Sequence, residues 1–323
     1  MAKKQVVAGI DIGGTNTVIG FVDREGNILA EYKIKTAKYP DINDFVAAIF
    51  ENVNKFSSGL GKDVELVGFG VGTPMGNINK GTIEHAADLP WKGVIFLADI
   101  FGKYTKLPVV VTNDANAAAV GEMVYGGAKG MKDFIVITLG TGLGSGFVVD
   151  GKLVYGHDGF AGEIGHTSIR PGESNRDCGC GKKGCIETYA SATGLKRTLL
   201  KIMADSIEPS DLRKYSFEEL DAKIIHEAAL NGDPIAIKAF DHTGKMLGFK
   251  LADVVAHTNP EAIFLFGGLA LAKDLIFEPT KKHMEENLLS IYRGKVKLLE
   301  SHLSTQNAAV LGASSLVWSV REQ

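Results

Sequence analysis

A strand that ends in a glycine-rich corner and turns directly into a second strand occurs twice in this chain. The first copy runs from Val6 to Val22, with the corner Asp11-Ile-Gly-Gly-Thr15. The second copy runs from Ile135 to Val149, with the corner Gly140-Thr-Gly-Leu-Gly-Ser-Gly146. Repetition of one supersecondary unit predicts two related α/β halves that face a cleft.

Hydrophobic periodicity predicts the remaining elements. In the first half, a third strand makes a three-stranded meander with the first two, and helices alternate with buried strands after it. The second half is mostly helical after its corner. The predicted elements are strands 28–35, 66–71, 109–112 and 262–266, and helices 43–56, 94–104, 114–125, 192–204, 217–230 and 234–255.

The length of 323 residues is close to the upper limit for one hydrophobic core, so two domains are expected. The pattern predicts an N-terminal α/β domain over 1–125 and a larger C-terminal α/β domain over 126–306. We expect the last apolar segment, 307–321, to form a helix that rejoins the N-terminal domain.

Composition excludes several classes of protein. Lys and Arg total 35 and Asp and Glu total 38, so the formal charge of −3 argues against a nucleic-acid partner. The apolar run Ala308–Val320 is shorter than the roughly 20 residues that cross a bilayer, so no membrane segment is expected. The first apolar run ends at Asp11, short of a signal-peptide core, and this favours a cytoplasmic location.

The glycine corners are candidate phosphate sites. A corner without side chains lets backbone N–H groups approach an anion, and two such corners could hold one polyphosphate. Asp11 lies beside Gly13, Gly14 and Thr15, where a carboxylate could hold Mg²⁺. The alternative is that these glycines only form hairpin turns. The P-loop pattern Gly-x-x-x-x-Gly-Lys-Ser/Thr does not occur, so a P-loop kinase is excluded.

The chain has only three cysteines, Cys178, Cys180 and Cys185, and they lie within eight residues. Together with His166 they offer a Cys₃His set that suits tetrahedral Zn²⁺. Because protein would fill all four positions, the zinc would be structural and would place the carboxylates of Glu163 and Glu187. The alternative is three inert buried thiols.

Asn113-Asp114 follows a buried strand and opens a helix, so the Asp114 carboxylate is an acid–base candidate where a strand end meets a cleft. The competing interpretation is a helix N-cap, which local sequence alone favours because Asp and Asn are common N-cap residues.

Taken together, these motifs resemble the ROK family of sugar kinases and sugar-responsive repressors, which have the two-domain actin/hexokinase-like ATPase fold. The motifs are Asp11-Ile-Gly-Gly-Thr15, Asn113-Asp114, Gly162-Glu-Ile-Gly-His166 and Cys178-x-Cys-Gly-x-x-Gly-Cys-x-Glu187. The resemblance covers essentially the whole chain. Glu187-Thr-Tyr-Ala-Ser-Ala-Thr-Gly194 is similar to the glucokinase branch of the family.

The resemblance implies roles for individual residues. Asp114 would be the base for the sugar 6-hydroxyl, and Asn113, Glu163, His166 and Glu187 would hydrogen-bond other hydroxyls. His166 would also bind zinc through its second nitrogen, together with the three cysteines. The residues implied for ATP phosphates and Mg²⁺ are Asp11, Gly13, Gly14, Thr15, Gly140, Thr141 and Gly142, and Gly267 and Gly268 would border the adenosine.

The implied function is ATP-dependent phosphorylation of glucose to glucose 6-phosphate, the first step of glycolysis, by a homodimer. Kinases for N-acetylmannosamine, N-acetylglucosamine or fructose are alternatives. A non-catalytic sugar sensor is another, although the repressors need a DNA-binding segment before the first corner and ten residues precede Asp11 here. One position departs from the family pattern: Asp88 stands in Asp88-Leu-Pro-Trp91 where many members have Asn.

Overall fold

The computed structural model describes residues 3–59, 63–169, 176–303 and 308–321. The chain divides into two compact units. Unit 1 comprises 1–131, 152–162 and 301–323, and unit 2 comprises 132–151 and 163–300. The boundary in the sequence pattern, after residue 125, therefore differs by six residues. The segment 152–162, which that pattern assigned to the C-terminal domain, belongs to unit 1.

Unit 1 contains both ends of the chain and is built around one five-stranded sheet with the order β3-β2-β1-β4-β8. β1 is antiparallel to β2 and parallel to β4, which is parallel to β8. Its elements are β1 (Lys4–Ile12), β2 (Thr17–Asp23), β3 (Ile28–Ile34), α1 (Ile42–Gly59), β4 (Val64–Thr73), β5 (Gly76–Asn77), β6 (Thr82–Glu84), β7 (Val94–Ile95), α2 (Leu97–Phe101), β8 (Val109–Asn113), α3 (Asp114–Val124), β11 (Lys152–Leu153) and α8 (Ala308–Arg321). The predicted three-stranded meander is confirmed.

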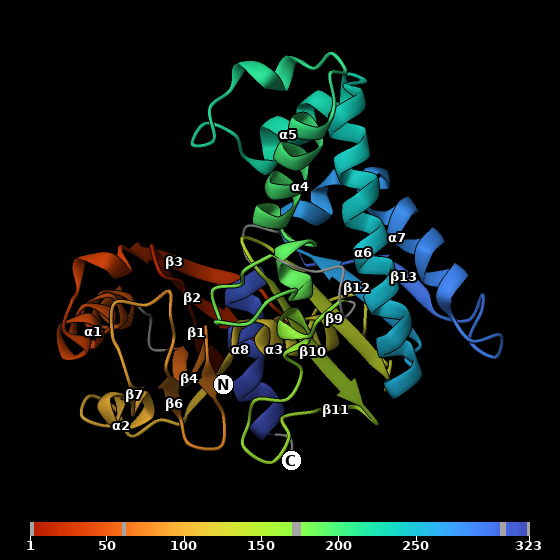
Figure 1. Ribbon diagram of the computed structural model, residues 1–323. Helices are drawn as coiled ribbons and strands as arrows, with labels where there is room; N and C mark the ends of the chain where they lie inside the picture. The colour runs from red at the N-terminus through yellow and green to blue at the C-terminus, as the bar shows by residue number, and fades with distance from the viewer. Residues whose placement is uncertain (1–2, 60–62, 170–175, 304–307, 322–323) are drawn as a thin grey trace. The chain divides into compact units, whose positions relative to one another are not determined.

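The two faces of this sheet are covered in different ways, because residues alternate between faces along a strand. Ala8 and Ile10 of β1 lie in the core cluster that includes Phe45 and Phe50 of α1. The intervening Gly9 faces α8. A Cβ on Gly9 would lie 2.2 Å from the carbonyl oxygen of Val310, so a glycine is needed there for α8 to approach the strand. α8 also packs along α3, and Figure 1 shows the two helices side by side.

One predicted helix of unit 1 is wrong. The segment 94–104 forms the short strand β7, which pairs with β6 through Ile95 and Ile83, and then only the five-residue helix α2. The apolar residues of this segment read as a helical face, but pairing with β6 competes successfully for its first residues. α2 ends at Gly102.

Unit 2 repeats the arrangement of unit 1. Its strand order is β10-β9-β12-β13, with β9 antiparallel to β10 and parallel to β12, which is parallel to β13. This is the pattern of β2-β1-β4-β8, so the predicted repetition extends from the corner to the sheet. The elements are β9 (Phe134–Leu139), β10 (Leu143–Val149), η2 (Ile164–His166), η3 (Ile186–Thr188), α4 (Ala192–Asp205), η4 (Asp211–Lys214), α5 (Ala222–Leu230), α6 (Pro234–Thr258), β12 (Ala262–Phe266), η5 (Gly268–Ala272), α7 (Asp274–Asn287) and β13 (Lys297–Glu300).

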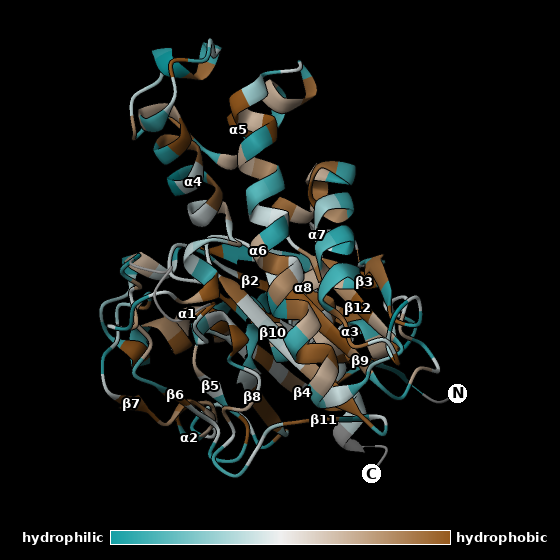
Figure 2. Ribbon diagram, turned by 45° about the vertical axis from the view of Figure 1, so that its right-hand side comes forward, coloured by the Kyte–Doolittle hydropathy of each residue, from teal (hydrophilic) through white to brown (hydrophobic). Residues whose placement is uncertain are grey.

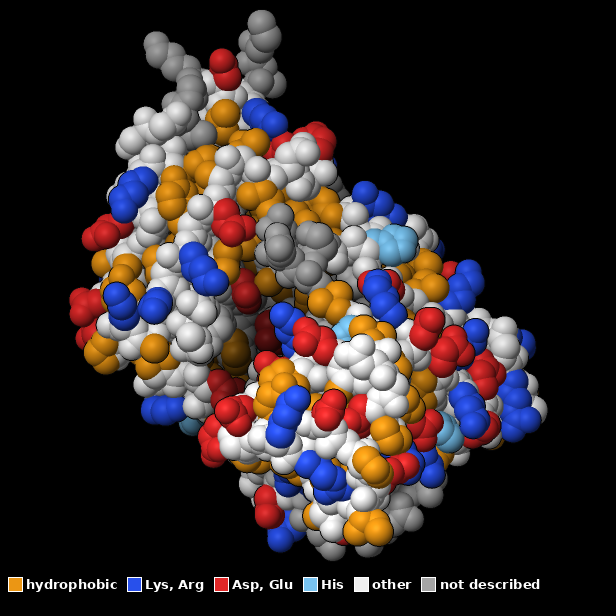
Figure 3. Space-filling view, turned by 90° about the horizontal axis from the view of Figure 1, so that it is seen from above, with side chains coloured by type: hydrophobic (Ala, Val, Ile, Leu, Met, Phe, Trp, Pro, Cys, Tyr) orange, Lys and Arg blue, Asp and Glu red, His pale blue; other side chains and the backbone are white. Residues whose placement is uncertain are grey.

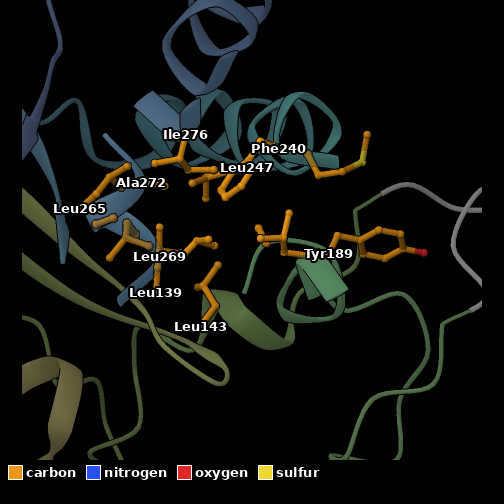
Figure 4. Packing of buried hydrophobic residues seen from close by; sticks show 14 of the residues in the cluster. Leu139, Leu143, Tyr189, Phe240, Leu247, Leu265, Leu269, Ala272 and Ile276 are labelled. Atoms are coloured by element: carbon orange, nitrogen blue, oxygen red, sulfur yellow. The ribbon is translucent and has the colours of Figure 1, made fainter. Parts of the chain in front are cut away.

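The core of unit 2 forms where α6 and α7 cover the sheet. Leu139 of β9 and Leu265 of β12 are fully buried, as are Leu247 of α6 and Ile276 of α7, and Figure 4 shows their side chains in one packed layer. Figure 2 shows β9 and β12 as predominantly hydrophobic, whereas α4 and α5 mix hydrophilic and hydrophobic residues. The strands therefore supply the continuous apolar surface, and the helices contribute one face each.

The predicted helix 217–230 begins five residues later than expected, at Ala222. Ser216 and Glu219 exchange the hydrogen bonds of a capping box, but the residues that follow do not form a helix until Ala222. Asp221 provides the actual cap, because its carboxylate accepts a 2.8 Å hydrogen bond from the amide of Ile224.

Within the described residues, no helix combines the length and the apolar character needed to cross a membrane. Acidic and basic side chains are interspersed on the surface in Figure 3, as the near-neutral charge of the chain predicts.

Candidate active site

In unit 1, the candidate residues meet because three parallel strands end at one edge of the sheet. Asp11 of β1 pairs with Gly72 of β4, and Thr73 pairs with Asn113 of β8. Gly72 keeps this edge compact, since a Cβ there would lie 3.2 Å from the Cβ of Ala117 in α3. Asp11, Asn113 and Asp114 therefore share one edge, the usual location of sites in open α/β sheets.

The structure assigns the helix cap to Asn113, not to Asp114. Asn113 has extended backbone angles, and its Oδ1 accepts a 2.8 Å hydrogen bond from the amide of Ala115. Asp114 is the first helical residue, and its Oδ1 accepts from the same amide at 2.8 Å. Because Asn113 caps the helix, the second carboxylate oxygen of Asp114 is left for other partners.

The charge of Asp114 acts on Asp11. Burial, together with the nearby charge of Asp114, raises the pKa of Asp11 to about 7. Surrounding protein also raises the pKa of Asp114, against the lowering effect of hydrogen bonds from backbone amides, although solvent reaches its side chain. A raised pKa makes Asp114 a better proton acceptor. Because the pKa of Asp11 is also raised, Asp11 needs a cation beside it to stay ionised below neutral pH.

The Asp11 corner is closed by a hydrogen bond from the amide of Gly13 to the carbonyl oxygen of Asn16 at 3.0 Å, and Thr15 is exposed. A Cβ on Gly14 would lie 2.3 Å from the carbonyl oxygen of Asp88. Gly14 is therefore needed for the approach of the Asp88 loop. Asp88 itself is exposed beside this corner.

In unit 2, the second corner is assembled in the same way. β9 and β12 are parallel, so Gly140 and Gly267 follow strands that end at one edge. Gly267 has φ +101°, and a Cβ there would lie 2.7 Å from the carbonyl oxygen of Leu139. The start of α4 also reaches this corner, because the amide of Ala192 donates to the carbonyl oxygen of Gly140 at 2.9 Å. Backbone groups of three elements thus surround Gly140, Thr141 and Gly142.

Glu187 lies against this corner. Its Oε2 accepts a 3.1 Å hydrogen bond from the amide of Leu143, and a Cβ on Gly142 would lie 2.2 Å from the same oxygen. A side chain at position 142 would thus displace the Glu187 carboxylate from this position, a contact that local sequence does not reveal. The β10 strand begins at Leu143, so the corner is shorter than the glycine pattern indicated.

The ligand atoms of His166, Cys178, Cys180 and Cys185 all lie within 4.8 Å of one another. The Cys180 and Cys185 sulfurs are 3.7 Å apart, and the Cys178 sulfur is 3.6 Å from Nδ1 of His166. Ligands of a tetrahedral zinc are separated by about 3.8 Å for two sulfurs and about 3.5 Å for sulfur and nitrogen. Burial raises the pKa of Cys178 to about 12, so its thiolate needs a cation beside it. The four residues fit zinc.

His166, the fourth candidate ligand, lies close to the second glycine corner. Glu163 directly precedes η2 and His166 is its last residue, and a Cβ on Gly165 would lie 2.1 Å from the carbonyl oxygen of Leu143. With Nδ1 of His166 turned to the sulfurs, Nε2 is the nitrogen left for a hydroxyl. Glu163, His166 and Glu187 are therefore all positioned around the start of β10.

Sequence reasoning missed Arg176. Its guanidinium donates to the carbonyl oxygens of Thr188 at 2.7 Å and Gly194 at 3.2 Å, and to the hydroxyl of Thr198 at 3.0 Å. It also lies 4.1 Å above the ring of Tyr189. Arg176 thus connects the cysteine loop to the turn that carries Glu187. An arginine two residues before the first cysteine gives no sign of this role.

Comparisons with known proteins show the family of this chain. The sequence model described as the ROK family matches residues 7–320. The glucokinase of Halalkalibacterium halodurans is 36% identical over 320 residues, which cover 98% of this chain and 94% of that protein. The xylose repressor of Bacillus subtilis is 31% identical and covers 96% of this chain and 76% of its own length.

A solved structure is also similar. The ROK family glucokinase of Streptomyces griseus, in complex with glucose and AMPPNP, is 35% identical with a TM-score of 0.80. The match covers 96% of this chain and 98% of that one. This chain belongs to the ROK family, and its fold is the two-domain ATPase fold of the family's sugar kinases.

Proposed function

We propose that the protein is a glucokinase that transfers the γ-phosphoryl group of ATP to the 6-hydroxyl of glucose. The observation that carries the proposal is the edge of β1, β4 and β8, where Asp114 is the first helical residue after the Asn113 cap and lies close enough to Asp11 to raise its pKa. The glucokinase relatives, at 32–36% identity, support the choice of sugar.

In this mechanism, Asp114 orients the sugar oxygen in line with the γ-phosphorus and accepts its proton. Phosphoryl transfer passes through a loose transition state in which the proton can leave late, so a carboxylate is a sufficient base. Asn113 can donate from Nδ2 to a hydroxyl while its Oδ1 caps α3. Glu163 and Glu187 would accept hydrogen bonds from the remaining hydroxyls, and Nε2 of His166 would form one with a further hydroxyl. A sugar that lacks one of these hydroxyls would leave a polar group of the protein unpaired.

The glycine corners would hold the nucleotide. Backbone amides at Gly13, Gly14 and Thr15, and at Gly140, Thr141 and Gly142, would meet the phosphates, and Gly267 and Gly268 would border the adenosine. Asp11 would hold Mg²⁺ or its waters; the cation neutralises phosphate charge and would stabilise the ionised Asp11. Zinc on His166 and the three cysteines would have a structural role, fixing the loop that carries Glu187.

Two further parts of the proposal concern location and assembly. The reduced thiols of the zinc set favour the cytoplasm. A homodimer is the assembly that the family resemblance predicts, and sedimentation velocity at micromolar concentration tests it.

An assay of ADP release tests the function. Purified protein is supplied with ATP, Mg²⁺ and, in turn, glucose, mannose, fructose, N-acetylglucosamine or N-acetylmannosamine. We expect glucose to give the highest kcat/KM, at least about tenfold above the others, because each changed hydroxyl or added acetamido group alters a buried polar contact. A higher kcat/KM for another sugar would reassign the substrate. Binding of a sugar without ADP release would support the sensor related to the xylose repressors.

A further inference from the structure

The chain passes between the two units four times, after residues 131, 151, 162 and 300. The first and last of these passages carry the chain out of α3 and back toward α8. The side chain of Glu122, which plays no part in the proposed chemistry, makes hydrogen bonds to both of these passages.

Glu122 lies in the last turn of α3 and is fully buried. Its Oε2 accepts a 2.7 Å hydrogen bond from the amide of Gly127, in the outgoing segment. Its Oε1 accepts from the hydroxyl of Ser301 and, at 3.4 Å, from the amide of Leu303, in the returning segment. One carboxylate therefore joins both segments to the same helix.

The surroundings of Glu122 are unfavourable for a carboxylate unless it makes these hydrogen bonds. A negative charge in the last turn of a helix is unfavourable to the helix dipole. A buried charge is also costly unless hydrogen bonds satisfy it, and no salt bridge to Glu122 occurs among the described residues. Gly126 leaves space for the group, since a Cβ there would lie 2.1 Å from Oε2.

Beyond this attachment the outgoing segment contains a glycine with a positive φ. Gly130 has φ +82°, and a Cβ on it would meet nothing within 4 Å. The segment is thus fixed to α3 at Gly127 and conformationally permissive at Gly130, just before the chain enters unit 2. At the other end of α3, about 12 Å from Glu122 at 1.5 Å per residue, lies Asp114.

We propose that Glu122 is the hinge anchor of the enzyme, a positioning residue that fixes the two linking segments to α3 when the units move on sugar binding. The inference rests on the proposed function, because it assumes closure around a sugar. Glu122 does not touch the substrate. It makes α3 a rigid connection between the pivot and the Asp114 carboxylate.

The test compares Glu122→Gln with wild type and with Asp23→Asn. Asp23 is a matched control because its carboxylate is also fully buried in unit 1 and hydrogen-bonded, to Lys4 and Asn27, but holds no linking segment. Glutamine keeps the size of Glu122, yet its amide nitrogen cannot accept the hydrogen bond that one carboxylate oxygen accepts. Amide hydrogen exchange of ligand-free protein is measured first, in peptides that contain Gly127 and Leu303.

We expect Glu122→Gln to speed exchange of those two peptides at least about tenfold, and Asp23→Asn to leave them unchanged. Small-angle scattering with saturating glucose should show compaction of wild type and of Asp23→Asn, and less compaction of Glu122→Gln. The glucose KM of Glu122→Gln should rise about fivefold to tenfold, with zinc content unchanged. Ser301→Ala, which removes one of the three contacts, should have an intermediate effect.

Unchanged exchange at Gly127 and Leu303 would overturn the anchor. Faster exchange with unchanged compaction and KM would show a structural role alone and would also overturn the proposal, as would a wild type that binds glucose without compaction. Because the exchange measurement needs neither sugar nor turnover, its outcome is separate from that of the ADP-release assay.

Discussion

At the scale of single residues, the proposed function depends on which of two neighbouring residues caps the N-terminus of α3. Asn113 and Asp114 are both able to cap a helix, and both accept from the amide of Ala115. Extended backbone angles at Asn113 make it the cap and place Asp114 inside the helix. The residue that caps the helix and the residue that we propose as the base are thus neighbours in the sequence.

Replacement of Asp114 by Asn should reduce kcat by about 10²–10⁴-fold, the usual contribution of a general base, and leave glucose affinity within a few-fold. Steady-state kinetics and calorimetric titration with glucose measure the two effects. Asp44→Asn is the control, since Asp44 also lies in the first turn of a helix, α1, but is exposed and remote from the strand edge. Undiminished turnover in Asp114→Asn would remove this residue as the base.

Arg176 should affect sugar binding through Glu187. Its Nη1 donates to the carbonyl oxygen of Thr188, the residue after Glu187. We expect Arg176→Met to raise the glucose KM about tenfold, equivalent to about 1.4 kcal/mol, with zinc retained. Arg197→Met is the matched control, because Arg197 donates to the carbonyl oxygen of Asp177 at the surface. Equal KM values for the two variants would contradict a positioning role.

At the scale of elements, the cysteine loop and the second glycine corner are one construction. Glu187 accepts from Leu143 at the corner, and its Oε1 lies 3.6 Å from the Cys178 sulfur. The cysteine cluster, the Glu187 carboxylate and the second glycine corner are therefore in continuous contact within unit 2. A disturbance of the loop should reach both proposed substrates.

We expect about one zinc per chain, and we expect Cys180→Ser to lose both the metal and sugar binding, because a metal site contributes directly to the folding of the loop that it closes. Metal analysis and glucose titration test this. Lys183→Ala, which changes an exposed residue of the same loop, should keep both. A metal-free protein with full activity would refute the structural zinc.

At the scale of the whole molecule, the chain builds two units on one plan. In each, a strand, a corner and an antiparallel strand are followed by parallel strands on the other side. The proposed sugar ligands come from both units: Asn113 and Asp114 from unit 1, and Glu163, His166 and Glu187 from unit 2. Glucose should therefore stabilise both.

At a glucose concentration of 100 Kd, we expect the protein to gain about 2.7 kcal/mol of stability, since the sugar binds only the folded state. Amide exchange should slow in peptides of both units, around Asp114 and around Glu187. L-Glucose, the mirror image, is the control and should give neither effect. Protection confined to one unit would contradict the proposed role of the sugar ligands in the other.

Much of the fold and of the site could be predicted because it depends on short-range patterns. Short apolar runs indicate strands, and the repeated corner indicates two halves that the sheets of both units confirm. The family follows from the order of His166, the three cysteines and Glu187. The structure brings the ligand atoms of His166 and the three cysteines within 4.8 Å of one another. The errors at 94–104 and 217–221 arose where a distant strand or a better cap outcompeted a local helical signal.

The sequence by itself determined the repeated strand-and-corner plan, the family and the residue types of the site, because these depend on neighbours a few positions apart. Only the tertiary structure decided what depends on residues far apart. It showed that Gly14 leaves room for the Asp88 loop and Gly142 for the Glu187 carboxylate, that 152–162 belongs to unit 1, and that Glu122 holds two segments about 175 residues apart. Such contacts arise from packing after the chain has folded, and no spacing in the sequence encodes them.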